Sequence, residues 1–307
     1  MMPVALFFDA IIFSFLILSG AILIHIWHHW GRFRRKKLAA LFAVVLSIGW
    51  GVVFYGSFIE SNILTTRETS IVLPSANPDA SETIRVALIS DLHLGPYHGE
   101  EWAQKVVVAI QKEHPDLIFL AGDFVAGLPE EAEGLAPLKD LSARYGVFAV
   151  TGNHEYEHGA ASAVIAALER DGITVLQNAS KEIVVGEKTF TLVGISDIWY
   201  ADDLPKALEG VSDVNPLVLL THNPDTEFLP EAARADLVIA GHTHGGQIRL
   251  PWIGAIGSIP DKLGRAYDRG LFPYGTGQLF VTSGVGTSGP RARLFNPPVI
   301  DVLTLTF

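Results

Sequence analysis

The sequence contains no cysteine among its 307 residues. This absence excludes disulfide scaffolds, thiol catalysis and thiolate zinc sites, so any metal ion must be held by His, Asp, Glu or Asn. Basic residues are also scarce, because 22 Lys and Arg stand against 33 Asp and Glu, a net charge of −11. A protein that neutralises nucleic-acid phosphates needs a basic surface, so we expect no nucleic-acid partner.

Charged residues make up only 18% of the chain and hydrophobic residues 49%, with a mean hydropathy of +0.32. The chain is therefore too apolar for an ordinary soluble domain and too charged for a polytopic membrane protein. The average hides two unlike parts, since residues 1–60 carry a net charge of +3 and the other 247 residues carry −14. The acidic part is long enough to form one hydrophobic core.

Two segments, 10–27 and 38–59, contain no Asp, Glu, Lys or Arg. Each is near the length that crosses hydrocarbon as a helix, so they predict two transmembrane helices. A cleaved signal peptide is the alternative for the first segment, but Asp9 precedes it and a His- and Trp-rich stretch follows it. The loop 28–37 holds five basic residues, and such loops stay on the cytoplasmic side. Both chain ends are then expected on the outer side. The basic loop is also compatible with docking to anionic lipids.

Beyond residue 60 the chain alternates β-rich runs with helix-patterned segments, which is typical of an α/β fold. Apolar strands are predicted at 85–90, 116–121, 147–151, 217–221 and 237–240, and helices at 101–113 and 160–170. A loop is predicted at 74–82. Alternating runs that suit antiparallel strands lie at 181–185, 189–195, 278–282 and 299–306.

Each of the five apolar strands ends in a polar cluster, and the carboxyl ends of parallel strands line the ligand crevice of an open α/β sheet. Seven side chains in these clusters are oxygen or nitrogen donors: Asp91, His93, Asp123, Asn153, His222, His242 and His244. Seven donors are too many for one four-ligand ion and suit two ions that share a carboxylate. Asp123 is the predicted bridge because it stands alone at its strand end. A lone buried His is more often a core residue, but packing does not explain the whole set.

Five motifs together resemble the calcineurin-like metallophosphoesterases in order and spacing: DLHLG (91–95), GDF (122–124), GNHE (152–155), THNPD (221–225) and GHTHGGQIRLP (241–251). The resemblance covers residues 61–307 and is closest to a small membrane-associated bacterial branch, which includes enzymes similar to UDP-2,3-diacylglucosamine pyrophosphohydrolases. It implies a four-layer α/β/β/α sandwich. It also implies one ion held by Asp91, His93, Asp123 and His244, and a second held by Asp123, Asn153, His222 and His242. His154 matches the family's non-ligand His that assists phosphoryl transfer.

Charge explains what such a site would do. Two divalent ions, two carboxylates and a bridging hydroxide leave about one positive charge to attract a phosphate. The ions lower the pKa of shared water and clamp phosphate oxygens, so hydroxide attacks phosphorus in line. Asp123 and His154 are therefore the predicted catalytic residues, with His154 protonating the leaving oxygen or holding transition-state charge. The donor set suits Mn²⁺, Zn²⁺ or Fe better than Ca²⁺ or Mg²⁺.

Three further features lie near the motifs. Arg249, Arg291 and Arg293 are candidate substrate-binding residues, because guanidinium groups bind phosphate in a bidentate manner. A run of apolar residues after the last motif either forms a lip for an acyl chain or packs in the core: Trp252, Ile253, Ile256, Ile259, Leu271 and Phe272. The GxGxxG match at 284–289 is followed by a proline rather than a helix, so it predicts a glycine loop at the site and not dinucleotide binding.

Together these features predict a membrane-anchored phosphohydrolase or phosphodiesterase with an anchor at 1–60 and a catalytic domain at 61–307. We expect a multi-pass protein of the bacterial cytoplasmic membrane with its catalytic domain on the periplasmic side and a lipid-linked phosphate ester or pyrophosphate as substrate. A UDP-2,3-diacylglucosamine-type pyrophosphohydrolase of lipid A synthesis is an alternative, although that substrate is made on the cytoplasmic face. A membrane protein that only binds or senses phosphate is an alternative of another class, against which the intact Asp123 and His154 argue.

Overall fold

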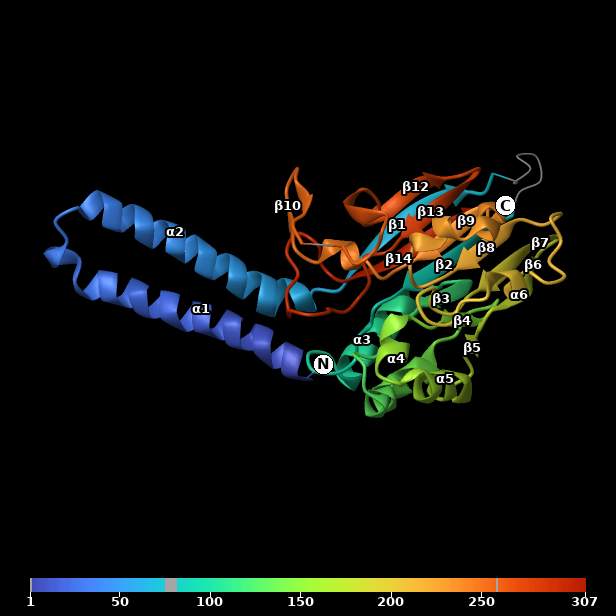
Figure 1. Cartoon of the computed structure of the whole chain (residues 1–307), viewed down its shortest axis with the longest axis horizontal. Coiled ribbons are helices and arrows are strands. Elements are labelled where there is room, and N and C mark those ends of the chain that lie inside the picture. The colour runs from blue at the N-terminus through green and yellow to red at the C-terminus, as the bar shows by residue number, and fades with distance from the viewer. Residues whose placement is uncertain (1, 75–81, 258) are drawn as a thin grey trace.

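The structure is a computed structural model of the chain and describes residues 2–74, 82–257 and 259–307. Two long helices, α1 (Met2–His28) and α2 (Lys36–Phe54), form a hairpin that projects from a body of two β-sheets (Figure 1). A π-helical turn (Tyr55–Ile59) and a 3₁₀ turn (Glu60–Asn62) connect α2 to the first strand. The predicted loop at 74–82 falls mostly outside the described residues.

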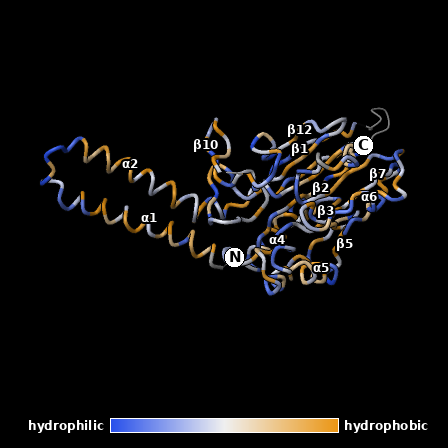
Figure 2. Tube along the Cα trace, in the orientation of Figure 1, coloured by the Kyte–Doolittle hydropathy of each residue, from blue (hydrophilic) through white to orange (hydrophobic). Residues whose placement is uncertain are grey.

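The helical hairpin is apolar over most of its length (Figure 2). The segments Val4–His28 and Lys36–Asn62 are long and apolar enough to cross a membrane, and few of their residues are buried. The predicted spans lie within these two segments. The basic connection between the helices lies at the far end of the hairpin, whereas the start of α1 and the end of α2 both lie beside the sheets (Figure 1).

The first sheet contains six strands, of which β2, β3, β4 and the edge strand β5 run parallel. The strand β14 joins this sheet between β1 and β2, parallel to the first and antiparallel to the second. In spatial order the strands are β1 (Thr65–Val72), β14 (Val299–Thr306), β2 (Thr83–Ile89), β3 (Leu117–Ala121), β4 (Val147–Val150) and β5 (Thr174–Val175).

The second sheet also contains six strands, with antiparallel hairpins at its two edges and a parallel centre. In spatial order they are β12 (Gly270–Tyr274), β13 (Gly277–Val281), β9 (Leu237–Ala240), β8 (Leu217–Leu220), β7 (Lys188–Gly194) and β6 (Ala179–Val185). The strand β13 pairs antiparallel with β12, as predicted for its segment, but parallel with β9. A separate small hairpin is formed by β10 (Arg249–Leu250) and β11 (Gly254–Ala255).

The two sheets pack face to face, because their strands are apolar on both faces. Val86 and Phe119 from the first sheet and Phe190 and Ile239 from the second belong to one buried cluster. Helices cover the outer face of the first sheet: α3 (Glu100–Lys112), the 3₁₀ segment η4 (Pro129–Asp140) and α5 (Ala161–Arg170). Shorter ones cover the outer face of the second: α6 (Leu204–Ala207) and η6 (Pro230–Arg234). The predicted four-layer α/β/β/α sandwich is therefore confirmed.

The remaining helical segments are short, and all of them except η1, which connects α1 and α2, lie in the connections between strands. They are α4 (Asn153–Glu157), η1 (Trp30–Arg32), η5 (Asp225–Phe228), η7 (His244–Gly246) and η8 (Gly264–Tyr267). Two of them carry candidate ligands, because α4 follows β4 directly and η7 follows β9.

Candidate metal centre

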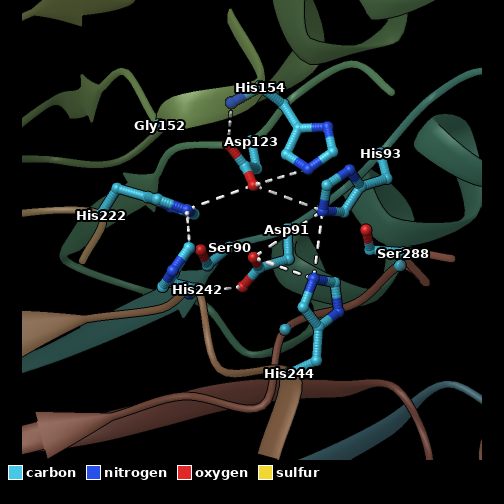
Figure 3. A network of polar contacts seen from close by, with 12 residues as sticks. Ser90, Asp91, His93, Asp123, Gly152, His154, His222, His242, His244 and Ser288 are labelled. Atoms are coloured by element: carbon cyan, nitrogen blue, oxygen red, sulfur yellow. Dashed lines mark hydrogen bonds and ion pairs between the residues drawn. The ribbon is translucent and has the colours of Figure 1, made fainter. Parts of the chain in front are cut away.

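The polar clusters after the five apolar strands converge on one place, as shown in Figure 3. The first sheet supplies the donors after β2, β3 and β4, and the second sheet supplies those after β8 and β9. All seven predicted ligands are buried there: Asp91, His93, Asp123, Asn153, His222, His242 and His244. The structure thus brings the whole predicted set together.

The backbone at these positions is strained. Five of the seven residues have positive φ, with 57° at Asp91, 45° at His93, 54° at Asp123, 69° at His242 and 51° at His244. Left-handed backbone costs a non-glycine residue roughly 1–2 kcal/mol. Strain of this kind persists where the surrounding structure enforces it, and it clusters at functional sites.

Three side chains form one cluster at the β2 and β9 ends. The Nε2 atoms of His93 and His244 lie 3.1 Å apart, and Asp91 Oδ1 lies 3.3 Å from His244 Nε2 and 3.9 Å from His93 Nε2. The other carboxylate oxygen of Asp91 accepts a hydrogen bond from the His242 backbone N–H at 3.1 Å. Asp91 is therefore fixed with one oxygen facing the two imidazoles.

A second cluster contains His222 and His242, whose facing nitrogens Nε2 and Nδ1 are 3.1 Å apart. The Nδ1 atom of His222 lies 2.8 Å from the carbonyl oxygen of Ala121, which aims its Nε2 at the cluster. Asp123 connects the two clusters, because its Oδ2 atom lies 3.2 Å from His222 Nε2 and 3.4 Å from His93 Nε2. One carboxylate oxygen thus faces both groups of donors, as the predicted bridge requires.

Some buried polar atoms of the two clusters lack a hydrogen-bond partner and are suited to bind a cation. Asp91 Oδ1 and Asn153 Oδ1 are buried and have no hydrogen-bond partner among the described residues. Buried acceptors without partners are costly, and cations satisfy them. The amide nitrogen of Asn153 donates to Glu157 Oε1 at 2.8 Å, which fixes the orientation of its free oxygen. The oxygen and imidazole donors present here therefore fit divalent transition metals.

Burial and mutual charge shift the pKa values of the cluster. Burial lowers the pKa of His242 to about 3 and holds those of His93 and His244 well below their usual value, so these imidazoles are neutral and can act as ligands. Burial opposes protonation of His222 as well, but the carboxylate of Asp123 outweighs it and raises the pKa of His222 to about 10. A cation bound between the clusters would take over the charge balance that this proton supplies.

His154 lies at the start of α4, next to the shared carboxylate. Its backbone N–H donates to Asp123 Oδ1 at 3.0 Å, and its Nδ1 atom lies 2.9 Å from the carbonyl oxygen of Ala126. Its Nε2 atom lies 4.0 Å from Asp123 Oδ2. Burial acts against protonation, but Asp123 and the Ala126 carbonyl raise the pKa of His154 above its usual value. The side chain is thus placed to donate a proton toward the centre.

Glu155, to which the sequence assigned no role, holds the loop that carries Asp123. Its buried carboxylate accepts hydrogen bonds from the backbone N–H groups of Asp123 at 3.1 Å, Phe124 at 2.8 Å and Gly152 at 2.7 Å. The side chain thereby joins the loops after β3 and β4. In the sequence, only its place in the GNHE motif indicates a role for Glu155. The three backbone N–H groups that it binds can be identified only from the fold.

Replacing Glu155 with alanine is expected to lower the free energy of unfolding by about 3 kcal/mol, because three buried N–H groups lose their acceptor. The measurement is thermal unfolding of the full chain in detergent. Glu155→Gln is the matched variant, since it keeps one acceptor oxygen and should lose less stability. Unfolding of Glu155→Ala at the wild-type temperature would show that the carboxylate does not hold the loops.

Gly152 shows why the GNH motif begins with glycine. A Cβ atom at this position would collide with the carboxylate of Asp123 and with the imidazole of His222. The glycine loop at 284–289 makes a similar approach, because a Cβ on Gly284 would lie 2.8 Å from the Cβ of Asp91. Both loops are thus packed directly against candidate ligands, and a pocket residue, Ser288, belongs to the second loop.

The three candidate substrate-binding arginines are engaged elsewhere. Arg249 pairs with Asp268, and Arg291 forms a bidentate ion pair with Asp9 at 2.8 and 2.6 Å. Arg293 is fully buried and donates to backbone carbonyl groups, including that of Gly286 at 2.6 Å. Within the described residues, none of the three lines the cavity at the centre. Their part in phosphate binding stays a prediction, and each would first have to leave its present partner.

A cavity of about 740 Å³ opens beside the centre. It is lined by apolar side chains, by Trp199 and by five residues of the centre: Asp123, Asn153, His154, His242 and His244. The ring of Trp199 packs edge-on against that of His242, with the ring centroids 4.7 Å apart. The volume is that of a pocket for a small molecule. A small molecule in this cavity can therefore reach the candidate metal-binding residues.

Comparison with known proteins agrees with this geometry. The sequence model of the calcineurin-like phosphoesterase family matches residues 84–246. A Campylobacter jejuni protein described as an uncharacterized metallophosphoesterase is 30% identical over 276 residues, which are 88% of this chain and 70% of that protein. The Escherichia coli phosphodiesterase YaeI is 30% identical over 218 residues, 68% of this chain and 77% of its own length. A Danio rerio transmembrane protein with a metallophosphoesterase domain is 29% identical over 236 residues, 71% of this chain and 52% of its own.

The chain therefore belongs to the calcineurin-like phosphoesterase family. It is a metal-dependent phosphoesterase with two apolar helices that are long enough to span a membrane. The predicted family and enzyme class are confirmed.

Proposed function

We propose that the chain is a membrane-anchored phosphohydrolase or phosphodiesterase that works with two divalent ions at the centre described above. The observation that supports this most strongly is Asp123 Oδ2, which faces His222 at 3.2 Å and His93 at 3.4 Å. A carboxylate shared between two donor groups is what a two-metal site requires. Mn²⁺, Zn²⁺ or Fe is the expected metal.

In this proposal Asp91, His93, Asp123 and His244 hold one ion, and Asp123, Asn153, His222 and His242 hold the other. The bound ions would activate water as a nucleophile and clamp the oxygens of a phosphate ester. His154, fixed through its Nδ1 contact with Ala126, protonates the leaving oxygen or holds transition-state charge. Glu155 and Gly152 keep the two loops at the distance that this arrangement needs.

Hydrolysis of two chromogenic esters tests the function. The full chain in detergent, stripped of metal and then supplied with Mn²⁺, Zn²⁺, Fe²⁺ or Mg²⁺, is expected to release p-nitrophenol from bis-p-nitrophenyl phosphate or p-nitrophenyl phosphate. Which ester reacts faster defines the preference for diester or monoester. Absence of release with every metal would contradict the proposal for these two ester classes and leave a narrower pyrophosphatase.

The domain boundaries and the membrane arrangement belong to the same proposal. Residues 1–60 form the anchor and residues 61–307 the catalytic domain, in the bacterial cytoplasmic membrane. The basic connection at 28–37 lies at the far end of the helical hairpin (Figure 1), so a cytoplasmic connection would leave the sheets on the periplasmic side. A periplasmic, lipid-linked phosphate ester is then the expected substrate, because enzyme and substrate share one surface. This placement disfavours a nucleotide-lipid pyrophosphate made on the cytoplasmic face.

A reporter fused after Phe307 tests the orientation. Alkaline phosphatase, which is active only outside the cytoplasm, is expected to be active at this position, and green fluorescent protein is expected to stay dark. Removing the basic residues of the connection should weaken this preference, since Lys and Arg in short loops set orientation. A bright fluorescent fusion with an inactive phosphatase fusion would place the catalytic domain in the cytoplasm and revive the pyrophosphohydrolase alternative.

A further inference from the structure

The first turns of α1 lie against the catalytic cavity. Phe8 lines that cavity together with Asp123 and His154, although 115 positions separate it from the nearer of these two in the sequence. The next residue, Asp9, forms the bidentate ion pair with Arg291. A helix counted as a membrane span thus contributes a side chain to the candidate active site.

A network around Arg291 fixes this contact. Its guanidinium group lies over the rings of Tyr97 at 4.9 Å, Phe58 at 5.5 Å and Phe13 at 5.9 Å. The Tyr97 hydroxyl lies 3.2 Å from the carbonyl oxygen of Ala5, at the start of α1. Both side chains of the ion pair are partly buried, with 29% of Arg291 and 17% of Asp9 exposed, so salt screens their attraction less than that of an exposed pair. Arg291 therefore contacts both α1 and the turn that follows α2.

The cavity lining combines two kinds of chemistry. Besides the polar residues of the centre it includes a group of apolar side chains, Phe8, Ile248, Ile256, Pro260 and Pro290. The predicted membrane span begins at residue 10, directly after the ion-paired Asp9. A ligand that fills this cavity would therefore place its charged group at the centre and an apolar part within one helical turn of the bilayer.

The β10–β11 hairpin adds a second apolar element on the same side. Its tip is exposed, with Trp252 at 103% and Ile253 at 70% of their full surface. Trp252 has a φ of 65°, a strained conformation for an aromatic residue. Figure 1 places this hairpin on the side of the body from which α1 and α2 project. Exposed tryptophan is typical of the membrane–water interface.

We propose that Phe8 forms the bilayer-side wall of the catalytic pocket and that the pocket takes a phosphodiester whose alcohol carries a long alkyl chain held in the membrane. This inference rests on the proposed phosphodiesterase function. When the phosphate moves to the centre, the first methylene groups of the chain leave the bilayer, and Phe8 with Ile256 covers them where water would otherwise do so. The Asp9–Arg291 pair holds Phe8 at that position.

Two esters that differ only in chain length test whether Phe8 forms this wall: p-nitrophenyl hexadecyl phosphate and p-nitrophenyl methyl phosphate. Both are offered to the full chain in phosphatidylcholine nanodiscs with Mn²⁺. Phe8→Ala is expected to lower kcat/KM for the hexadecyl ester about tenfold, the effect of exposing roughly two methylene groups to water. The loss for the methyl ester is expected to be much smaller. Phe42→Ala is the matched control, because Phe42 lies on α2, is 53% exposed and is not among the residues that line the cavity.

Each outcome decides the matter. A loss confined to the hexadecyl ester in Phe8→Ala, with Phe42→Ala at the wild-type value for both esters, supports Phe8 as the wall of the pocket. Equal losses for both esters, or no loss for either, would overturn this assignment, and so would an equal effect of Phe42→Ala. If the wild-type chain hydrolyses neither ester with any metal while binding two ions, the proposed phosphodiesterase function fails and the wall fails with it.

Discussion

Replacing His154 with alanine is expected to lower turnover of bis-p-nitrophenyl phosphate by about 10²-fold or more, the usual contribution of a general acid, while the metal content stays unchanged. The reason is positional. The imidazole Nε2 lies 4.0 Å from Asp123 Oδ2, and the contact of Nδ1 with the Ala126 carbonyl at 2.9 Å holds the ring so that Nε2 faces the centre, where it can donate a proton to the leaving oxygen. Steady-state hydrolysis and metal analysis of the same preparation measure both parts of the prediction.

His158→Ala is the matched control for this variant. His158 ends the same short helix and is exposed, and it is not among the residues that line the cavity. Its replacement should leave turnover at the wild-type value. Unchanged turnover in His154→Ala would remove His154 from the mechanism, whereas loss of bound metal would make it a ligand and contradict the assignment of roles.

Asp123→Asn is expected to have the largest effect, a loss of hydrolysis of about 10³-fold or more together with loss of at least one ion. A bridging oxygen bonds to both ions, and an amide removes one negative charge and replaces one of the two oxygens with a group that cannot bind metal. The backbone contacts of Glu155 with this loop do not use the Asp123 side chain, so the fold should persist. Metal content and turnover of one sample test the prediction.

Asp140→Asn, at an exposed position on η4, controls for the change of charge and should behave as wild type. Two ions bound to Asp123→Asn with wild-type affinity would show that the two clusters do not share this carboxylate. Activity near the wild-type level would contradict the proposed centre as a whole.

The sequence predicted the central strands well because burial on both faces leaves a clear signal. The strands β2, β3, β4, β8 and β9 each begin within two residues of the predicted position. The first edge strand, β1, was not predicted, since its sequence TTRETSIV is mostly polar. Its position depends on pairing with β14, more than 230 residues away, including an ion pair between Arg67 and Asp301.

The candidate ligands could be predicted because each lies shortly after a strand. The end of a strand fixes the edge of the sheet at which the following side chains lie. The ion pair of Arg291 could not be predicted, since its partner Asp9 lies 282 residues away, directly before the predicted membrane span. Phe8 was missed for the same reason, because hydropathy does not show which face of a helix meets another element. Core packing of Trp252 and Ile253, one of the two alternatives, is wrong, since both are largely exposed.

The number of divalent ions bound per chain tests the proposed centre most directly. The full chain is stripped with a chelator and titrated with Mn²⁺, while bound metal and hydrolysis of bis-p-nitrophenyl phosphate are measured on the same samples. We predict two ions per chain at saturation, with full hydrolysis only when both are bound. Full activity with one ion per chain would contradict the shared-carboxylate, two-metal account.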